Sequence, residues 1–165
     1  IWFDSEEGKG STFYFTIPII LADDESEKKV MDDAGNIAGK VDKILFADDD
    51  DVNFLLIGRI LSFLKPQKIK GFSNGKDLYN EFYMDRDYNI IILDIQMPVM
   101  DGIECLKQIR RLNKDIPVIA LTAFSNKTDK EKYLNLGFTD YISKPIEKED
   151  FLKKISFNNK NASNK

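Results

Sequence analysis

The chain has 165 residues, of which 42% are hydrophobic and 32% are charged, and its formal net charge is -4. This balance is typical of one globular domain with a few dozen residues to spare, and it excludes collagen-like and disordered chains. No apolar run approaches the roughly 18 residues of a membrane-spanning helix. The chain starts at Ile1 without an initiator Met or a basic, apolar leader, so we expect a soluble piece of a longer protein. The presence of only one cysteine favours a reducing, cytoplasmic setting.

The rarest residue types restrict the chemistry further. Cys105 is the only cysteine, which excludes an internal disulfide and a multi-cysteine metal site. The sequence contains no histidine, which excludes Ser-His and Cys-His nucleophile pairs and imidazole metal ligands. Any chemistry must therefore use carboxylates, lysine, hydroxyls and an oxygen-liking metal ion.

The first quarter of the chain has little capacity to form a core of its own. Gly8-Lys9-Gly10 is typical of a hairpin turn. Residues 21–42 hold seven acidic residues and three lysines but no aromatic residue, which predicts a solvated linker. Residues 43–165 carry 20 basic and 18 acidic side chains without a basic stripe, so the sequence does not indicate nucleic-acid binding.

Strand and helix patterns alternate through the rest of the chain. The runs 89–93 and 117–121 are continuously apolar, which is typical of strands buried on both faces of a parallel sheet. The expected strands are 43–47, 69–72, 89–93, 117–121 and 138–142, and the expected helices are 51–64, 74–84, 102–112, 126–136 and 147–157. Five β-α repeats predict a doubly wound α/β fold, followed by a frayed polar tail at 158–165.

Polar residues follow the expected strands on the side where such folds bind ligands. The first strand ends in Asp48-Asp49-Asp50-Asp51, the third in Asp94, the fourth in Thr122, and the fifth is soon followed by Lys144. Because the carboxyl ends of parallel strands share one edge of the sheet, these groups should lie together. Crowded carboxylates without histidine favour Mg²⁺, which also binds phosphate oxygens. The sequence therefore predicts a site for phosphoryl chemistry.

These motifs closely resemble the receiver domains of two-component signalling, over residues 43–157. The resemblance rests on Ile44-Leu45-Phe46-Ala47-Asp48-Asp49, Asp94-Ile95-Gln96-Met97-Pro98-Val99-Met100-Asp101-Gly102, Ala120-Leu121-Thr122-Ala123 and Tyr141-Ile142-Ser143-Lys144-Pro145. It implies a flavodoxin-like five-stranded sheet of order 2-1-3-4-5. It also implies a phosphorelay function in which a histidine kinase or a histidine phosphotransfer protein donates a phosphoryl group from phosphohistidine.

The resemblance also assigns roles to the site residues. Asp94 would be the phosphoacceptor, and Mg²⁺ would be held by Asp48, Asp49 and the backbone carbonyl of Gln96. Lys144 and Thr122 would contact the phosphoryl oxygens, and Tyr141 would be the switch aromatic. An ionised Asp is a competent nucleophile at neutral pH, so the chemistry agrees with these roles.

Residues 1–20 resemble a different domain, the ATP-binding domain of histidine kinases. The stretch Trp2-Phe3-Asp4-Ser5-Glu6-Glu7-Gly8-Lys9-Gly10-Ser11-Thr12-Phe13-Tyr14-Phe15-Thr16-Ile17-Pro18 looks like the last hairpin of that domain, with Gly8 and Gly10 in its second glycine-rich box. Together the two resemblances imply a hybrid sensor histidine kinase whose full-length form can be anchored in the inner membrane. The fragment itself lacks the other nucleotide-binding boxes and the phosphoacceptor histidine, so we expect a self-phosphorylating receiver that is not a kinase by itself, within a parent that is a protein-histidine kinase.

Two other functions compete with the receiver. A haloacid-dehalogenase-type phosphatase would use Asp48 and Asp50 as its acidic pair, but it would leave Asp94 without a role. A degenerate receiver could serve only as a protein-binding module, although the complete set of motif residues argues against this.

Two interaction surfaces can also be predicted. On the expected helix 51–64, a core stripe of Asn53, Leu56, Ile57, Ile60, Phe63 and Leu64 leaves Phe54 and Leu55 outside it, which makes these two residues candidates for phosphodonor docking. The structural alternative for Phe54 is packing against the C-terminal helix. The apolar hairpin at 1–20 should bury its surface on the receiver or on a second copy. We expect no membrane contact by the fragment.

Overall fold

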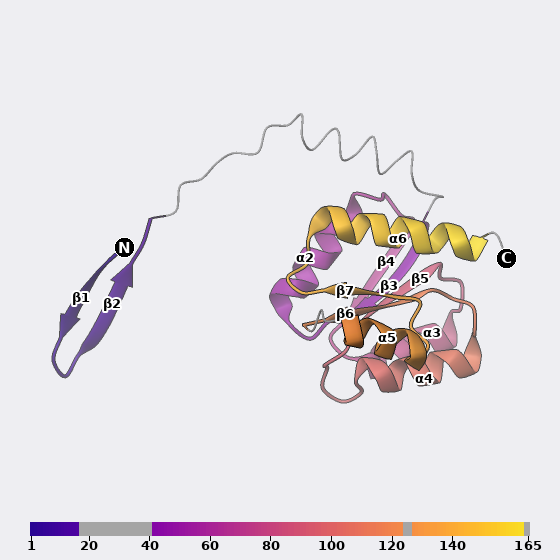
Figure 1. The fold of residues 1–165 in the computed structure, drawn as a ribbon, viewed down its shortest axis with the longest axis horizontal. Helices are drawn as coiled ribbons and strands as arrows, with labels where there is room; N and C mark the ends of the chain where they lie inside the picture. The colour runs from indigo at the N-terminus through magenta and orange to yellow at the C-terminus, as the bar shows by residue number, and fades with distance from the viewer. Residues whose placement is uncertain (17–40, 124–126, 164–165) are drawn as a thin grey trace.

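A computed structural model describes residues 1–16, 41–123 and 127–163, with the backbone alone for 127–130 and 160–163. Its main body is a five-stranded parallel sheet of order β4-β3-β5-β6-β7, with helices on both faces (Figure 1). The strands are β3 (Lys43–Ala47), β4 (Lys68–Phe72), β5 (Ile90–Asp94), β6 (Val118–Thr122) and β7 (Asp140–Ser143). The predicted doubly wound fold and its strand order 2-1-3-4-5 are therefore confirmed.

The apolar runs of the sequence form the middle of this sheet. Every residue of β5 and β6 is buried, because helices cover both faces, whereas every residue of the edge strand β4 is half-buried. The register places Ala47 beside Leu93 and Leu93 beside Ala120, so β3, β5 and β6 end at one level of the sheet. This register brings the polar residues at their carboxyl ends together.

Five helices lie in the described part of the chain, and polar caps start three of them. The helices are α2 (Asp51–Ser62), α3 (Gly75–Met84), α4 (Gly102–Leu112), α5 (Lys127–Leu136) and α6 (Lys148–Ser163). The side chains of Asp50, Asn74 and Asp101 accept hydrogen bonds from backbone N–H groups in the first turns of α2, α3 and α4. Helices α2 and α6 cover one face of the sheet, and α3, α4 and α5 cover the other (Figure 1). Each face has its own apolar core.

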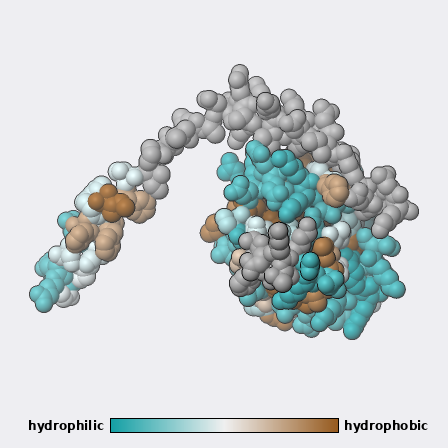
Figure 2. All heavy atoms as spheres, in the orientation of Figure 1, coloured by the Kyte–Doolittle hydropathy of each residue, from teal (hydrophilic) through white to brown (hydrophobic). Residues whose placement is uncertain are grey.

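The N-terminal hairpin is a separate two-stranded sheet of β1 (Trp2–Glu6) and β2 (Gly10–Tyr14). Gly8 and Gly10 adopt positive φ angles of 82° and 107°, which glycine accepts at little cost in a tight turn. Trp2 stacks on Tyr14 with ring centroids 5.4 Å apart. All residues from 1 to 16 are exposed, and Figure 2 shows hydrophobic residues on the hairpin surface. The expected burial on the receiver is thus not observed, and association with a second copy stays a prediction.

Three sequence predictions need correction. The tail at 158–165 is not frayed as a whole, because α6 continues to Ser163 and buries Asn158 and Asn159. The predicted linker 21–42 extends too far, since Val41 is 2% exposed and belongs to a core. Residues 17–20 of the predicted hairpin segment and 21–40 of the linker lie outside the described residues.

The third correction concerns the inward face of α2. Ile57, Ile60 and Leu61 are buried, whereas Leu56, which was expected in the core, is 38% exposed. The true stripe also includes Phe54, whose ring lies 4.9 Å from that of Phe46 on β3. Phe54 therefore packs against Phe46 of the sheet and against the apolar core to which α2 and α6 both contribute.

Candidate functional site

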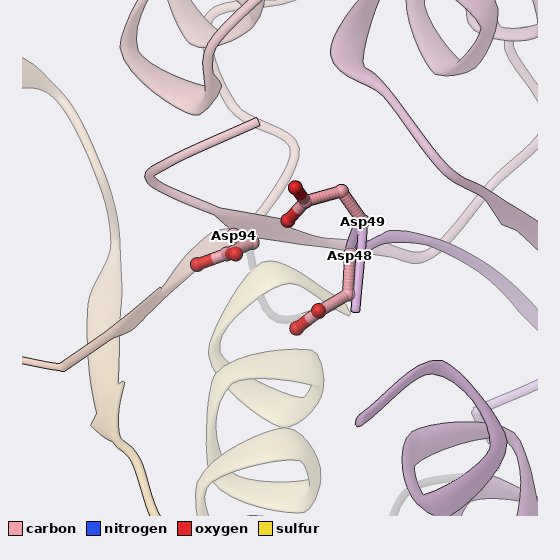
Figure 3. Close-up of side chains that lie close together, drawn as sticks. All are labelled: Asp48, Asp49 and Asp94. Carbon is pink, nitrogen blue, oxygen red and sulfur yellow. The ribbon is translucent and has the colours of Figure 1, made fainter. Parts of the chain in front are cut away.

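Three carboxylates meet at the carboxyl ends of β3 and β5. Asp48 and Asp49 follow β3 directly, and Asp94 is the last residue of β5. Each offers one carboxylate oxygen, and these oxygens lie within 4.8 Å of one another. Figure 3 shows the three side chains close together. Asp48 and Asp94 are buried and Asp49 is exposed, so the cluster lies at the surface end of the core.

Lys144, just after β7, joins two of these carboxylates. Its Nζ lies 2.8 Å from Oδ2 of Asp48 and 2.9 Å from Oδ2 of Asp94. Burial opposes the charged form of this lysine, but hydrogen bonds to Asp48 and Asp94 outweigh burial and raise the pKa of Lys144. The ammonium group is therefore charged at neutral pH.

One lysine does not neutralise the cluster. Burial raises the pKa of Asp94, the neighbouring charge of Asp48 raises it further, and Lys144 opposes both effects. Three carboxylates and one ammonium group give a formal charge of 1 - 3 = -2. A divalent cation with oxygen ligands fits this surplus charge and this donor set.

The loop after β5 places the backbone close to Asp94. A Cβ atom on Gly102 would lie 2.2 Å from the backbone oxygen of Asp94, so only glycine fits at the start of α4. The N–H of Gly102 donates to the carbonyl oxygen of Ile95 at 3.1 Å, which closes the loop. The loop thereby fixes Asp94 against the helix that follows it.

A cavity of about 650 Å³ opens beside the carboxylates. It brings together the predicted site residues Asp49, Asp94, Gln96, Thr122 and Lys144. Its full lining is Asp49, Asp50, Asn53, Asp94, Ile95, Gln96, Thr122, Ala123, Lys132, Tyr133 and Lys144. The cavity is wide enough to admit a phosphoryl group with its waters.

Thr122 has a partner that sequence analysis missed. Its Oγ1 lies 2.9 Å from the hydroxyl of Tyr133 on α5, and both residues are buried. Tyr141, the predicted switch residue, does not line the cavity but is half-buried against the core that includes Tyr133. A buried tyrosine hydroxyl normally needs a hydrogen-bond partner, and this rule could have indicated Tyr133 as a polar neighbour of the site.

The predicted docking residues on α2 differ from each other. Leu55 is 72% exposed, as expected, and its neighbour Val52 is 73% exposed. Phe54 is half-buried against Phe46, so its predicted place outside the core stripe is wrong. Asp50 caps α2 by accepting from the N–H of Asn53 at 2.8 Å.

An α/β fold with acids, a hydroxyl and a lysine in this arrangement is characteristic of the receiver class of proteins. The model of the response regulator receiver domain matches residues 44–156, and the chain belongs to that family. This assignment favours the receiver over the phosphatase alternative.

The relatives that match are long signalling proteins. Hybrid signal transduction histidine kinase K of Dictyostelium discoideum is 31% identical over 160 residues, covering 89% of this chain and 13% of that protein. The signal transduction histidine-protein kinase BarA of Escherichia coli K12 is 37% identical over 108 residues, covering 64% of this chain and 12% of that protein. The chain thus spans only a small part of the curated relatives it matches.

Solved structures agree with the fold. The receiver domain of a sensor histidine kinase from Pseudomonas aeruginosa superposes with a TM-score of 0.65 at 27% identity, covering 72% of this chain and 98% of that domain. That structure holds a magnesium ion coordinated in its active-site cleft. Among the described residues of the present chain, no helix combines the length and apolar character needed to cross a membrane.

Proposed function

We propose that this chain accepts a phosphoryl group from phosphohistidine onto Asp94 and changes conformation to pass the signal on. The observation that carries the proposal is the position of the Asp94 carboxylate, which lines an open cavity while Lys144 contacts its Oδ2 at 2.9 Å. The ionised carboxylate oxygen attacks phosphorus, the phosphorus–nitrogen bond of the donor breaks, and the imidazole leaves with that electron pair.

Mg²⁺ fits the acidic cluster on the chemistry of its ligands. The carboxylates of Asp48 and Asp49, together with the backbone carbonyl of Gln96, are the groups we propose to hold it. When bound, the ion neutralises charge on the phosphoryl oxygens and the acids. Lys144 would provide a second positive charge, and Thr122 provides a hydroxyl that can donate to one phosphoryl oxygen.

The conformational change is proposed to involve Thr122 and Tyr141. Thr122 moves toward the phosphoryl group, and the ring of Tyr141 turns inward to fill the space that Thr122 leaves. In the present structure Lys154 holds Tyr141 from α6, because its Nζ donates to the Tyr141 carbonyl oxygen at 2.8 Å and lies 4.7 Å from the ring centroid. A change at Tyr141 would thus reach the surface of α6.

The phosphodonor is proposed to dock on α2. Val52, Leu55 and Leu56 are exposed apolar residues on the first turns of that helix, directly after the acidic residues of the site. A helical partner carrying phosphohistidine, either a histidine kinase or a phosphotransfer protein, could cover them while reaching Asp94. Phe54 supports this surface from beneath through its contact with Phe46.

The wider context of the chain is also a proposal. The alignment with the Dictyostelium kinase covers 89% of this chain and thus extends beyond residues 44–156, which supports a hybrid histidine kinase as the parent. In that parent, residues 1–20 would end the ATP-binding domain, and the receiver would act in the cytoplasm.

Labelling with acetyl phosphate tests the function. In the presence of Mg²⁺, we expect intact mass to rise by one phosphoryl group in the unaltered chain and not in Asp94→Asn. Asp101→Asn is the matched control, because Asn also caps a helix and position 101 does not line the cavity. Label on Asp48 would indicate the phosphatase alternative. Absence of label from every variant would indicate a phosphorylation-independent binding module.

A further inference from the structure

Tyr133 places a phenol at the wall of the phosphoacceptor cavity while its ring belongs to the core. The residue is 3% exposed, and its ring meets that of Phe138 edge to face with centroids 6.1 Å apart. Its backbone carbonyl accepts a hydrogen bond from the N–H of Phe138 at 3.1 Å. Both ring and backbone are therefore held, and the residue lines the same cavity as Asp94.

We propose that Tyr133 is a positioning residue that latches Thr122 in the unphosphorylated arrangement. The proposal rests on the function proposed above and adds a control on it. The hydroxyl of Tyr133 lies 2.9 Å from Oγ1 of Thr122 in a buried hydrogen bond. Thr122 is 2% exposed, so bulk water does not compete for this bond at the threonine.

The hydrogen bond opposes the switch because Thr122 must change its rotamer, whereas the side chain of Tyr133 is held in place. Thr122 is β-branched, so turning Oγ1 toward a phosphoryl group means a jump to another staggered rotamer. Tyr133 cannot follow that jump, since its ring is packed against Phe138. Each activation of the receiver would therefore break the bond between the two hydroxyls.

The expected strength of the latch is modest. Because Tyr133 lines the cavity, a water molecule there can replace Thr122 as the partner of its hydroxyl after the switch. The loss is then that of one neutral hydrogen bond, which corresponds to roughly 2- to 10-fold in the equilibrium between the two arrangements. A latch of this size tunes the response without preventing it.

Affinity for beryllofluoride, a phosphoryl mimic, tests the latch in the presence of Mg²⁺. We expect Tyr133→Phe, which keeps the ring, to bind the mimic roughly 2- to 10-fold more tightly than the unaltered chain. Tyr83→Phe is the matched control, because Tyr83 is 55% exposed on α3 and does not line the cavity. The gain should vanish when the double variant Thr122→Val/Tyr133→Phe is compared with Thr122→Val alone, because the latch acts only through the Thr122 hydroxyl.

Equal or weaker binding by Tyr133→Phe would overturn the latch, and so would a gain that persists with Thr122→Val. If Tyr133→Phe does not fold, NMR of tyrosine-labelled unaltered chain decides instead, because the latch requires the Tyr133 ring-carbon shift at the hydroxyl to change on binding. An unchanged shift on a chain that binds the mimic overturns the latch alone. If the unaltered chain binds no mimic, the proposed function fails and the latch fails with it.

Discussion

Two groups of charged side chains lie on the same sheet, and only one of them is balanced. At the edge strand β4, Lys68 contacts Asp85 at 2.8 Å and Lys70 contacts Glu81 at 2.6 Å, so two positive charges meet two negative ones. At the carboxyl ends of β3 and β5, Asp48 and Asp94 both contact Lys144, and the carboxylate of Asp49 lies beside them as a third negative charge. We call these groups the edge network and the acidic site.

The pKa shifts have opposite signs in the two groups. In the edge network, the hydrogen bond from Lys70, followed by that from Tyr88, lowers the pKa of Glu81, so its ionised form is favoured in the fold. In the acidic site, burial raises the pKa of Asp94. The ionised Glu81 of the edge network therefore stabilises the fold, whereas ionised Asp94 in the acidic site costs stability in the absence of a bound cation. This contrast separates a structural cluster from a functional one.

Adding Mg²⁺ should produce the largest change in stability. At a concentration 100 times its dissociation constant, a ligand that binds only the folded chain adds about 2.7 kcal/mol to the free energy of unfolding. Asp49→Asn should weaken the gain measured by thermal melting at fixed Mg²⁺, whereas Glu81→Gln should leave it intact. A gain of equal size in Asp49→Asn would show that the ion binds elsewhere.

Neutralising Asp94 should stabilise the metal-free chain. We expect Asp94→Asn to raise the free energy of unfolding at neutral pH by about 1 kcal/mol, allowing for screening by water in the cavity. Because the pKa of Asp94 in the folded chain lies above its ordinary value of 3.8, the folded state binds the proton more readily in the window above 3.8. The contribution of this group to stability is thus lowest at neutral pH and improves as pH falls through the raised pKa.

Melting in chelator as a function of pH measures this effect. The advantage of Asp94→Asn should shrink on acidification, because the carboxyl group of the unaltered chain becomes neutral too. Asp101→Asn, which keeps its helix cap, should match the unaltered chain across the range. A lower melting temperature for Asp94→Asn at neutral pH would contradict the cost assigned to the acidic site.

Neutralising an acid in the edge network should lower the free energy of unfolding, the opposite of the effect expected at Asp94. Glu81→Gln removes the charge that faces Lys70 and weakens the acceptor of the Tyr88 hydroxyl, so we expect a loss of about 1 kcal/mol. High salt should reduce the loss, because part of it is electrostatic. Glu131→Gln on the exposed side of α5 is the control, and chemical denaturation measures both. An unchanged denaturation midpoint for Glu81→Gln would show that the edge network does not stabilise the fold.

The sequence was sufficient to predict the sheet and the acidic site because both depend on local patterns. Continuous apolar runs mark β5 and β6, and the residues after such strands must share one edge of the sheet. Asp48, Asp94 and Lys144 could be grouped on that basis, and the structure places them in contact.

The missed features depend on partners that are distant in sequence. Phe54 turns inward because Gly71 on β4 leaves room for it, and a Cβ there would lie 2.5 Å from the end of the Phe54 ring. Helix α6 continues past 157 because Asn158 finds acceptors in Asp140 and in the carbonyl of Lys154. No pattern within α2 or the polar tail contains this information.

The smallest change in stability is expected for the apolar surface beside the acidic site. Leu55 is 72% exposed, so Leu55→Asp should alter the free energy of unfolding by no more than about 0.5 kcal/mol. It should nevertheless slow phosphoryl transfer from a purified phosphohistidine phosphotransfer protein by roughly 10-fold, since a charged group would be buried at the docked interface. Labelling by acetyl phosphate should stay nearly unchanged, because a small donor does not cover α2.

Met84→Asp is the matched control, since Met84 is 83% exposed at the end of α3, outside the cavity lining. If Leu55→Asp slows both donors equally, the acidic site itself has been disturbed, and if Met84→Asp slows the protein donor as much, added negative charge is the cause and α2 is not the docking surface.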